Sequence, residues 1–256
     1  MRAKASQRGQ VASGVTVTAS ETAHFPSRGN GRQRKVPKSE QHYHSLLDNE
    51  RRRAKEERGQ SAEKLIRAME TTIEAMALTV EMRDPHTAGH QRRVTVLAVA
   101  IARELDLSEA EINGIRVAGI VHDVGKIQIP AEILSKPGRL TELEFGLIKN
   151  HPSTGYEILK NVEFPWPVAQ IVLQHHERMN GSGYPSGISG NDILLEARIL
   201  SVADVVEAMA SHRPYRPALG IGPALDEISK NSGILYDPKV ADACFKLFYE
   251  KEFSFD

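Results

Sequence analysis

Apolar residues recur at intervals of three and four along most of the chain from Gln41 onward, which is the spacing of one face of an α-helix. No stretch alternates apolar and polar residues for a useful length, so the pattern does not favour β-strands. The apolar periods are interrupted at Pro137 with Gly138 and in a loop over 180–190. The pattern therefore predicts an all-α fold, with about six or seven helices over 84–256 and a long helix in front of them.

Local signals mark where several of these helices begin. A hydroxyl residue followed three positions later by an acid forms a capping box, and proline suits the first helical turn, where its missing N–H has no partner to lose. The predicted starts are the pairs Ser108–Glu111 and Thr141–Glu144, Asp84 with Pro85, and Pro167. We expect the helix from Ser108 to stop at Gly125, and the helix from Thr141 to run on to His151.

The long helix is expected over 41–83. Its first half is highly charged, and an apolar stripe then emerges at Leu65, Ile66, Met69, Ile73, Met76 and Val80. This stripe either packs on the core of the following domain or pairs two chains in a parallel coiled coil, which would make the protein a homodimer. Fewer than three clean heptads are present, so both alternatives stay open.

The charge distribution separates the start of the chain from the rest. Residues 1–39 hold eight Lys or Arg and one acid, a net charge of +7, which leaves −7 for the remainder. This segment is rich in Ser, Gly, Gln and Thr and has no apolar period, a composition typical of disorder. We therefore expect a disordered basic tail over 1–40, a helical stalk over 41–83 and one helical domain over 84–256. Nucleic-acid binding is not favoured, because the body is acidic and lacks interleaved aromatic residues.

Membrane, secretory and disulfide-stabilised classes are not favoured either. No run approaches the ~20 apolar residues of a membrane-spanning helix, and the N-terminus lacks the apolar core of a secretory signal, so we expect a cytoplasmic protein. Cys244 is the single cysteine, and its apolar neighbours predict a buried free thiol. One cysteine excludes a disulfide within the chain and a thiolate zinc site.

Histidines and acids occupy inward-facing positions on the predicted helices. A lone inward histidine is usually a hydrogen-bonded core residue, but here three helices turn imidazoles inward and a fourth adds an aspartate. The set is His86, His90, His122, Asp123, His151, His175, His176 and Asp204. A carboxylate on an apolar helix is costly unless a cation neutralises it. Imidazole and carboxylate ligands without thiolates predict two divalent transition-metal ions, with iron or manganese favoured.

Two motifs resemble those of the HD-GYP domain family, a branch of the HD superfamily of metal-dependent phosphohydrolases. The matching segments are the doublet His122-Asp123 within His-Asp-Val-Gly-Lys, and the triplet Gly183-Tyr184-Pro185 within the segment that starts at His175. The likeness runs from about residue 84 to residue 216. It implies an HD-superfamily helical bundle and a cyclic di-GMP phosphodiesterase that releases linear pGpG and, often, GMP.

The resemblance also implies how the ligands divide. One ion would be held by His90, His122, Asp123 and Asp204, and the second by His151, His175 and His176, with Asp123 bridging. Two ions about 3.5 to 4 Å apart can share and deprotonate one water, so a bridging hydroxide would be the nucleophile. Some members bind a third ion through a glutamate at the position of His86. Histidine can also ligate, so a third ion, and with it full conversion to GMP, stays open.

Further residues match substrate-binding positions of the family. Lys126 is placed to meet a phosphate oxygen and assist the leaving group, which makes Asp123 and Lys126 the candidate catalytic residues. Arg213 and Arg216 match positions that hold phosphate, and Tyr184 is a candidate for stacking on guanine. Family loops of the Gly-Tyr-Pro kind are also implicated in contacts with diguanylate cyclase domains, so such a partner is expected here.

Two other functions compete with the phosphodiesterase. The first is a signalling module that binds cyclic di-GMP or a partner without hydrolysis, and loss of ligand residues would mark it. Every ligand position is filled in this chain, which favours the enzyme. The second is another HD-type hydrolase acting on nucleoside phosphates, against which the Gly183-Tyr184-Pro185 loop argues.

Overall fold

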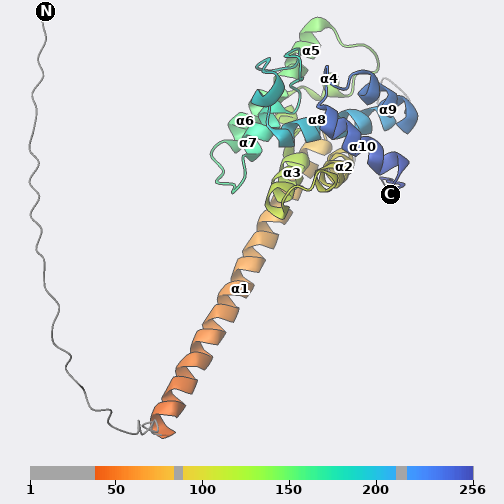
Figure 1. The fold of residues 1–256 in the computed structure, drawn as a ribbon. Coiled ribbons are helices and arrows are strands. Elements are labelled where there is room, and N and C mark those ends of the chain that lie inside the picture. The colour runs from red at the N-terminus through yellow and green to blue at the C-terminus, as the bar shows by residue number, and fades with distance from the viewer. Residues whose placement is uncertain (1–37, 84–88, 212–217, 256) are drawn as a thin grey trace, which may run out of the picture. The chain divides into compact units, whose positions relative to one another are not determined.

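The computed structural model describes residues 38–83, 89–211 and 218–255 (Figure 1). Contacts divide the chain into two units, Met1–Glu56 and Glu57–Asp256, and helix α1 (Lys38–Glu81) begins in the first and ends in the second. The described helices after α1 are α2 (His90–Glu104), α3 (Glu109–Val121), η1 (Val124–Gln128), α4 (Ala131–Leu134), α5 (Glu142–Lys149), α6 (His151–Leu159), α7 (Val168–Gln174), η2 (Gly190–Asp192), α8 (Leu195–Ala210), α9 (Ile221–Lys230) and α10 (Pro238–Tyr249).

The all-α prediction is confirmed. Within the described ranges, the only β-type pairing is an isolated bridge between Ser232 and Tyr236. The helices are more numerous than the sequence predicted, because the described part after α1 contains nine α-helices and two 3-10 helices. The additional elements are short, and α4 for example has four residues, too few for an apolar period to be recognised.

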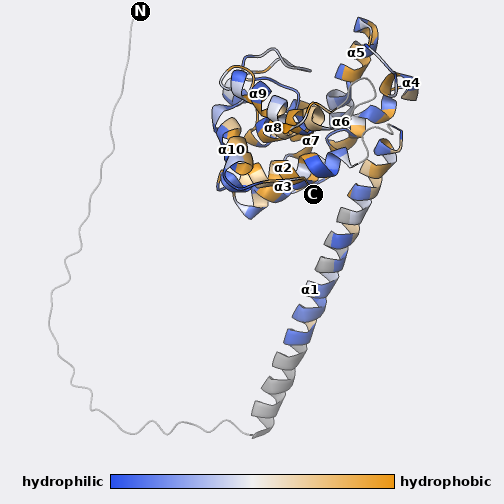
Figure 2. Cartoon of the chain, turned by 90° about the vertical axis from the view of Figure 1, so that its right-hand side faces the viewer, coloured by the Kyte–Doolittle hydropathy of each residue, from blue (hydrophilic) through white to orange (hydrophobic). Residues whose placement is uncertain are grey.

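The core lies in the second unit among α2, α3, α7, α8, α9 and α10. Figure 2 shows hydrophobic residues along α2, α3 and α8. Leu97, Ile115, Ile171 and Leu200 are fully buried, and burying such a side chain contributes about 1.5 to 3 kcal/mol relative to leaving it exposed. Because α2, α3, α7 and α8 also carry or adjoin the candidate ligands, the core fixes the positions of these ligands.

Helix α1 joins this core only near its C-terminal end. Most of its described length is hydrophilic (Figure 2). The residues that are buried or half-buried against the domain are Ile73, Ala77 and Val80. Core packing is thus confirmed for this end of the predicted stripe, while Met69 and Met76 are exposed. The side chains of Leu65 and Ile66 lie outside the described part, and the coiled-coil homodimer stays a prediction.

Three of the predicted helix starts are confirmed. Ser108 caps α3 and Thr141 caps α5, and in both the hydroxyl accepts from an amide three residues on while the glutamate there accepts from the cap amide. Pro167 directly precedes α7. These signals depend on neighbours within one turn, so the sequence alone contains them.

The predicted start of the helix that carries His90 falls on residues that the structure does not describe. Helix α2 begins at His90, because Gly89 takes the left-handed conformation with φ 73° and interrupts any helix that approaches from the N-terminal side. The expected cap at Asp84 and Pro85 lies outside the described residues. The start at Asp84 and the place of His86 therefore stay predictions.

Two further boundaries differ around η1 and α6. Helix α3 ends at Val121, so Gly125 is not its stop but lies inside η1. A Cβ on Gly125 would lie 2.0 Å from the carbonyl oxygen of His151, so glycine is required because η1 and α6 approach so closely. The helix expected from Thr141 to His151 is divided in two, with α5 ending at Lys149 and α6 beginning at His151.

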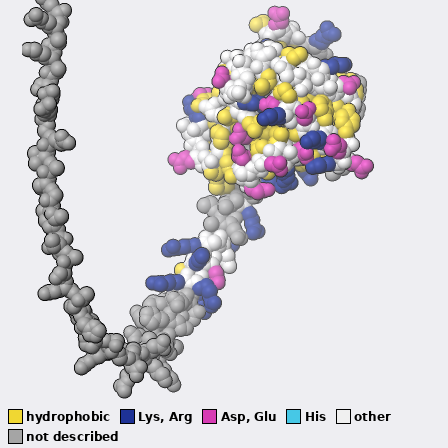
Figure 3. Space-filling model, viewed as in Figure 1, with side chains coloured by type: hydrophobic (Ala, Val, Ile, Leu, Met, Phe, Trp, Pro, Cys, Tyr) yellow, Lys and Arg dark blue, Asp and Glu magenta, His cyan; other side chains and the backbone are white. Residues whose placement is uncertain are grey.

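The remaining expectations concern the surface and the cysteine. No helix among the described residues is both long and apolar enough to cross a bilayer. On the globular part shown in Figure 3, basic and acidic side chains are interspersed, whereas basic side chains predominate along the described part of α1. Cys244 is free and buried, as predicted, and burial raises its pKa to about 12. Of the tail predicted over 1–40, residues 1–37 lie outside the described part and residues 38–40 belong to α1, and the domain boundaries stay predictions.

Candidate metal centre

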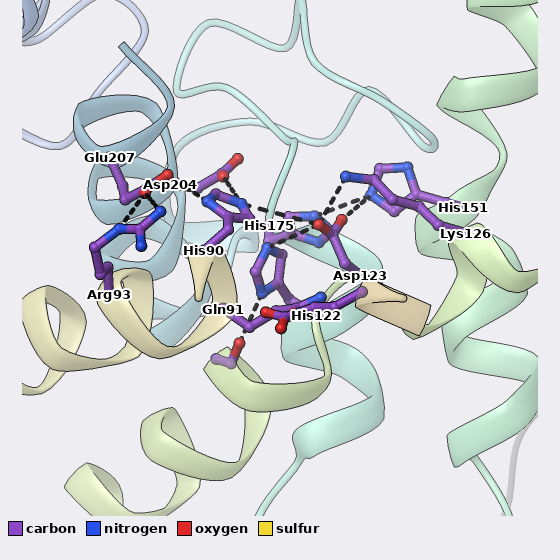
Figure 4. A network of polar contacts seen from close by, with 12 residues as sticks. His90, Gln91, Arg93, His122, Asp123, Lys126, His151, His175, Asp204 and Glu207 are labelled. Carbon is purple, nitrogen blue, oxygen red and sulfur yellow. Dashed lines mark hydrogen bonds and ion pairs between the residues drawn. The ribbon is translucent and has the colours of Figure 1, made fainter. Parts of the chain in front are cut away.

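The candidate ligands that the structure describes converge at the ends of helices around α8. His90 is the first residue of α2, His151 is the first residue of α6, and Asp204 lies within α8. The other ligands follow directly after α3 and α7, and they are His122, Asp123, His175 and His176. Figure 4 shows side chains from these separate elements pointing toward one another. The first and the last of these residues are more than a hundred positions apart in the sequence, and the fold brings the whole set to one place.

Three of the imidazoles are oriented in the same way. In each, Nδ1 lies 2.6 to 2.7 Å from the backbone carbonyl oxygen three residues earlier, and the pairs are His122 with Gly119, His151 with Ile148, and His175 with Val172. A carbonyl oxygen can only accept, so Nδ1 carries the proton. The lone pair is therefore on Nε2, which is the arrangement of a histidine that ligates a metal through Nε2.

These Nε2 atoms lack the partners that a protein interior normally provides. Nε2 of His122 is buried and has no hydrogen-bond partner among the described residues. Nε2 of His151 lies 3.2 Å from Nε2 of His175, and with both protons on Nδ1 two lone pairs face each other. A cation that both nitrogens bind removes this repulsion, so the donor set fits a metal site.

The candidate ligand atoms form two groups, and a third, overlapping set of His122, Asp123 and His175 joins them. The atoms within each group all lie within 4.8 Å of one another, and the groups are His90, His122 and Asp204, and His151, His175 and His176. Asp123 directs Oδ2 to 3.5 Å from His122 Nε2 and Oδ1 to 3.4 Å from His151 Nε2. One carboxylate thus faces both groups, as a bridging ligand does.

Burial and local charge give these groups the protonation states that metal binding needs. Burial lowers the pKa of His151 to about 4 and of His175 to about 3, in both cases against the opposing charge of Asp123. Burial alone would raise the pKa of Asp123 and Asp204, but Lys126 and the surrounding imidazoles hold the pKa of Asp123 well below its usual range, and His90 with the neighbouring imidazoles does the same for Asp204. Neutral imidazoles and ionised carboxylates are the metal-binding forms.

Lys126 supplies the cation next to this centre. It lies in η1, and its Nζ lies 2.7 Å from Oδ2 of Asp123. Its side chain keeps 16% of its exposure while that of Asp123 keeps 3%. The ammonium therefore lies at the edge of the buried centre, where an anionic ligand can reach it.

A carboxylate that the sequence analysis missed holds the first histidine. Glu207 is fully buried on α8, and its two oxygens are bonded to His90 Nδ1 on one side and to Arg93 and Ser211 on the other. The bond to His90 helps to lower the pKa of Glu207 to about 2, although burial opposes the shift. Glu207 is three residues after Asp204 on the same helix face, and this spacing was the signal available in the sequence.

The Tyr184 loop lies against the second group of ligands. The ring of Tyr184 stacks on His176, with 4.7 Å between ring centres and 28° between planes, and burial raises the pKa of the phenol. Lys149 places its ammonium 5.6 Å from the centre of the same ring. The other substrate candidates, Arg213 and Arg216, lie outside the described residues, as does His86.

Comparisons with known proteins agree with this geometry. The family described as HD domain matches residues 74–240. The chain is 44% identical over 177 residues to the cyclic di-GMP phosphodiesterase response regulator RpfG of Xanthomonas campestris, a match that covers 68% of this chain and 47% of the relative. It is 42% identical over 182 residues to a cyclic di-GMP phosphodiesterase of Thermotoga maritima, covering 70% and 49%.

The helical fold is also found among solved structures. The cyclic GMP-AMP specific phosphodiesterase V-cGAP3 of Vibrio cholerae superposes with a TM-score of 0.53 and 22% sequence identity, covering 70% of this chain and 49% of that one. At this identity the likeness extends to the fold alone. The chain spans about half the length of the two sequence relatives it matches.

Proposed function

We propose that this chain, which belongs to the HD-domain family, is a metal-dependent phosphodiesterase that hydrolyses cyclic di-GMP to linear pGpG. The observation that carries the proposal is the convergence of Nε2 atoms and carboxylate oxygens in two groups around Asp123. The choice of substrate is supported by the two sequence relatives, each of which is named as a cyclic di-GMP phosphodiesterase.

We assign one ion to His90, His122 and Asp204, a second to His151, His175 and His176, and Asp123 to both. Bound divalent ions would acidify a water molecule and neutralise charge on the scissile phosphate. Nitrogen and oxygen donors without sulfur suit iron or manganese. A third ion at His86 remains an open part of the proposal.

The chain's own residues would orient the phosphate and stabilise its charge. Lys126 can donate to a phosphate oxygen, and it is placed to protonate the 3′-oxygen when the phosphorus–oxygen bond breaks. Its contact with Asp123 keeps the ammonium directed at the centre before substrate arrives. Tyr184 would stack on a guanine, and Arg213 and Arg216, which follow α8, would hold phosphate oxygens bidentately.

Product analysis tests the reaction. Protein purified without oxygen and loaded with iron or manganese is incubated with cyclic di-GMP, and the products are separated by chromatography. We expect pGpG to accumulate first, and Asp123→Asn to abolish its formation because the residue between the two ligand groups loses its charge. Asp192→Asn removes an exposed carboxylate in η2 and serves as the control with unchanged turnover.

Other outcomes decide between the alternatives. Binding of cyclic di-GMP without product in the metal-loaded protein would contradict the proposal and favour a signalling module that does not hydrolyse. Supplying pGpG directly shows whether GMP is an end product. A panel with 3′3′-cyclic GMP-AMP and nucleoside monophosphates tests the substrate class, and preference for a monophosphate would favour another HD-type hydrolase.

Three expectations about the cellular context remain part of the proposal. They are contact of the loop over 180–190 with a diguanylate cyclase domain, pairing of two chains through α1, and a cytoplasmic location. Each is separate from the chemistry, so the failure of any one leaves the proposed reaction standing.

A further inference from the structure

Glu177 follows the histidine pair directly but belongs to neither ligand group. Its side chain is almost fully buried, with 3% exposure. One oxygen, Oε1, accepts from two consecutive backbone amides, Ser186 N at 2.7 Å and Gly187 N at 3.1 Å. The other oxygen, Oε2, is buried and has no hydrogen-bond partner among the described residues. A buried carboxylate with one unsatisfied oxygen lowers the stability of the folded state. Glu177 is therefore a candidate for a specific role.

The two amides belong to the exposed end of the loop that carries Tyr184. The near end of this loop is held by the backbone, because Tyr184 N donates to His176 O at 3.2 Å and a Cβ on Gly183 would lie 2.4 Å from Cα of Glu177. Ser186 and Gly187 are exposed, and a Cβ on Gly187 would make only an ordinary contact, 3.4 Å from the carbonyl oxygen of Gly181. The carboxylate of Glu177 thus holds the middle of the loop, directly after Tyr184 and Pro185, while Gly190 N donates to Met179 O at 3.0 Å farther along the chain.

The loop's position matters because of the stacking of Tyr184 on His176. The loop is tied to the histidine turn on both sides of that ring, by His176 O before it and by Glu177 after it. With both ties, the ring stays parallel to an imidazole of the second ligand group. Without Glu177, the stretch between Tyr184 and the next anchors, which are Ile188 against the core and Gly190 N on Met179 O at 3.0 Å, loses its side-chain tie, and the ring at its start becomes more mobile.

We propose that Glu177 is a positioning residue that sets substrate affinity by holding the Tyr184 loop against the histidine pair. This inference rests on the proposed function, in which Tyr184 stacks on the base of a cyclic dinucleotide. Glu177 acts on the loop and not on the ligand atoms, so its loss weakens substrate binding more than it slows the chemical step.

The test uses the full chain, with Glu177→Ala, Glu177→Gln and Tyr184→Ala, and the double variant of Glu177→Ala with Tyr184→Ala. Glutamine keeps an oxygen that can accept from both amides, whereas alanine keeps none. Should Glu177→Ala fail to fold, Glu177→Asp replaces it, since a side chain one methylene shorter reaches the amides poorly. Asp237→Asn is the matched control, because Asp237 is 7% exposed and lines the same small cavity as Glu177 but bonds Arg198 and Lys239 instead of the loop.

Two readouts are measured. Hydrogen–deuterium exchange of the peptide that contains Ser186 and Gly187 needs neither metal nor substrate, and we expect it to accelerate in Glu177→Ala but not in Glu177→Gln or Asp237→Asn. In metal-loaded protein we expect KM for cyclic di-GMP to rise about tenfold in Glu177→Ala, the loss of a charge-assisted hydrogen bond, with metal content unchanged and a smaller change in kcat. Because Glu177 acts through Tyr184, the double variant should have the KM of Tyr184→Ala.

Several results would overturn the inference. The first two are an unchanged exchange rate in Glu177→Ala and loss of metal in that variant. The third is a rise in KM of the same size in Asp237→Asn. The fourth is a KM in the double variant that rises by the product of the two single-variant factors. If the unsubstituted protein turns over no cyclic dinucleotide, the proposed function fails, and the exchange measurement still decides whether Glu177 holds the loop.

Discussion

At His90, carboxylates act on both nitrogens of one imidazole. Glu207 is bonded to Nδ1, while Oδ1 of Asp204 lies 3.2 Å from Nε2 on the opposite side of the ring. A carboxylate behind a ligating histidine fixes its tautomer and orientation and increases its basicity. Arg93 and Ser211 hold Glu207 in turn, so the orientation of His90 depends on atoms that never touch the metal position.

Removing this support should weaken metal binding. We expect Glu207→Ala to reduce the affinity for a divalent ion by about 10- to 100-fold. His90 then loses the carboxylate that keeps its proton on Nδ1 and fixes the orientation of its ring. Competition with a chelator of known affinity measures the change. Glu104→Ala, which removes a carboxylate paired with Lys246 and Lys251, is the control and should bind metal as the unsubstituted protein does. Equal affinity in Glu207→Ala would show that His90 is oriented without it.

The lowered histidine pKa values predict how metal-free protein responds to acid. His151 and His175 have pKa values of about 4 and 3 when folded, against 6.5 for the free side chain. Below pH 6.5 the unfolded chain binds protons that the folded site excludes, so stability is lost as pH falls and is unaffected above that pH. Each histidine contributes at most about 1.4 kcal/mol per pH unit.

Urea unfolding of metal-free protein between pH 7.5 and 5 measures this loss. Asp123, Asp204 and Glu207 also have lowered pKa values, but they lose their contribution to stability mainly as the pH falls below the ordinary values of 3.8 for Asp and 4.5 for Glu, which lie under the range measured. His175→Gln should show a shallower dependence on pH. A free energy of unfolding that stays constant from pH 7.5 to 5 would mean that the imidazoles are not buried in neutral form.

At the scale of elements, the contact between η1 and α6 places Lys126 and Asp123 next to His151. It is possible only because Gly125 has no side chain, since a Cβ there would meet the backbone of His151 and Gly155 at 2.0 and 2.6 Å. We expect Gly125→Ala to destabilise the fold by about 1 to 3 kcal/mol and to lower the bound metal, because η1 and α6 must separate. Urea unfolding and metal analysis of the same samples measure both effects.

A second glycine provides the control for this change. Gly146 lies within helix α5, and a Cβ there would meet nothing within 4 Å. Gly146→Ala should leave metal binding unchanged and stabilise the protein by up to about 1 kcal/mol, because alanine loses less backbone freedom on folding. If both substitutions had equal effects on metal content, the contact between η1 and α6 would not be what positions the ligands.

These two glycines also show which parts of the fold the sequence could predict. Helix starts at Ser108, Thr141 and Pro167 depend on residues within one turn, and they were found. The sequence predicts a helix stop at Gly125, and this prediction is wrong. No residue near Gly125 in the sequence indicates that the backbone of His151 approaches it. The sequence also does not predict the division between α5 and α6. No strong helix breaker occurs around Asn150 before Pro152, so the local pattern favours one continuous helix.

For the whole molecule, the sequence indicates the candidate ligand residues but not the groups that orient them. Inward spacing on separate helices was enough to find His90, His122 and Asp204 and their partners. Glu207 was missed because its bond to His90 joins residues 117 positions apart, and Glu177 was missed because its partners are backbone amides. Residue types suggest which atoms can ligate, while only the packed fold shows what holds them in place.

The second unit contains the candidate ligands that the structure describes and the described core, which predicts the effect of truncation. A chain that begins at residue 57 should keep its thermal stability, its bound metal and its turnover of cyclic di-GMP, because no described ligand or core residue precedes that point. A chain that begins at residue 84 loses Ala77 and Val80, which are 6% and 4% exposed, and it should unfold at a lower temperature because each lost core side chain uncovers apolar surface. Thermal unfolding and product chromatography on the full chain and both truncations measure the difference. Equal stability of the two truncations would mean that α1 only adjoins the domain, and loss of turnover on removing residues 1–56 alone would place a functional requirement in the first unit.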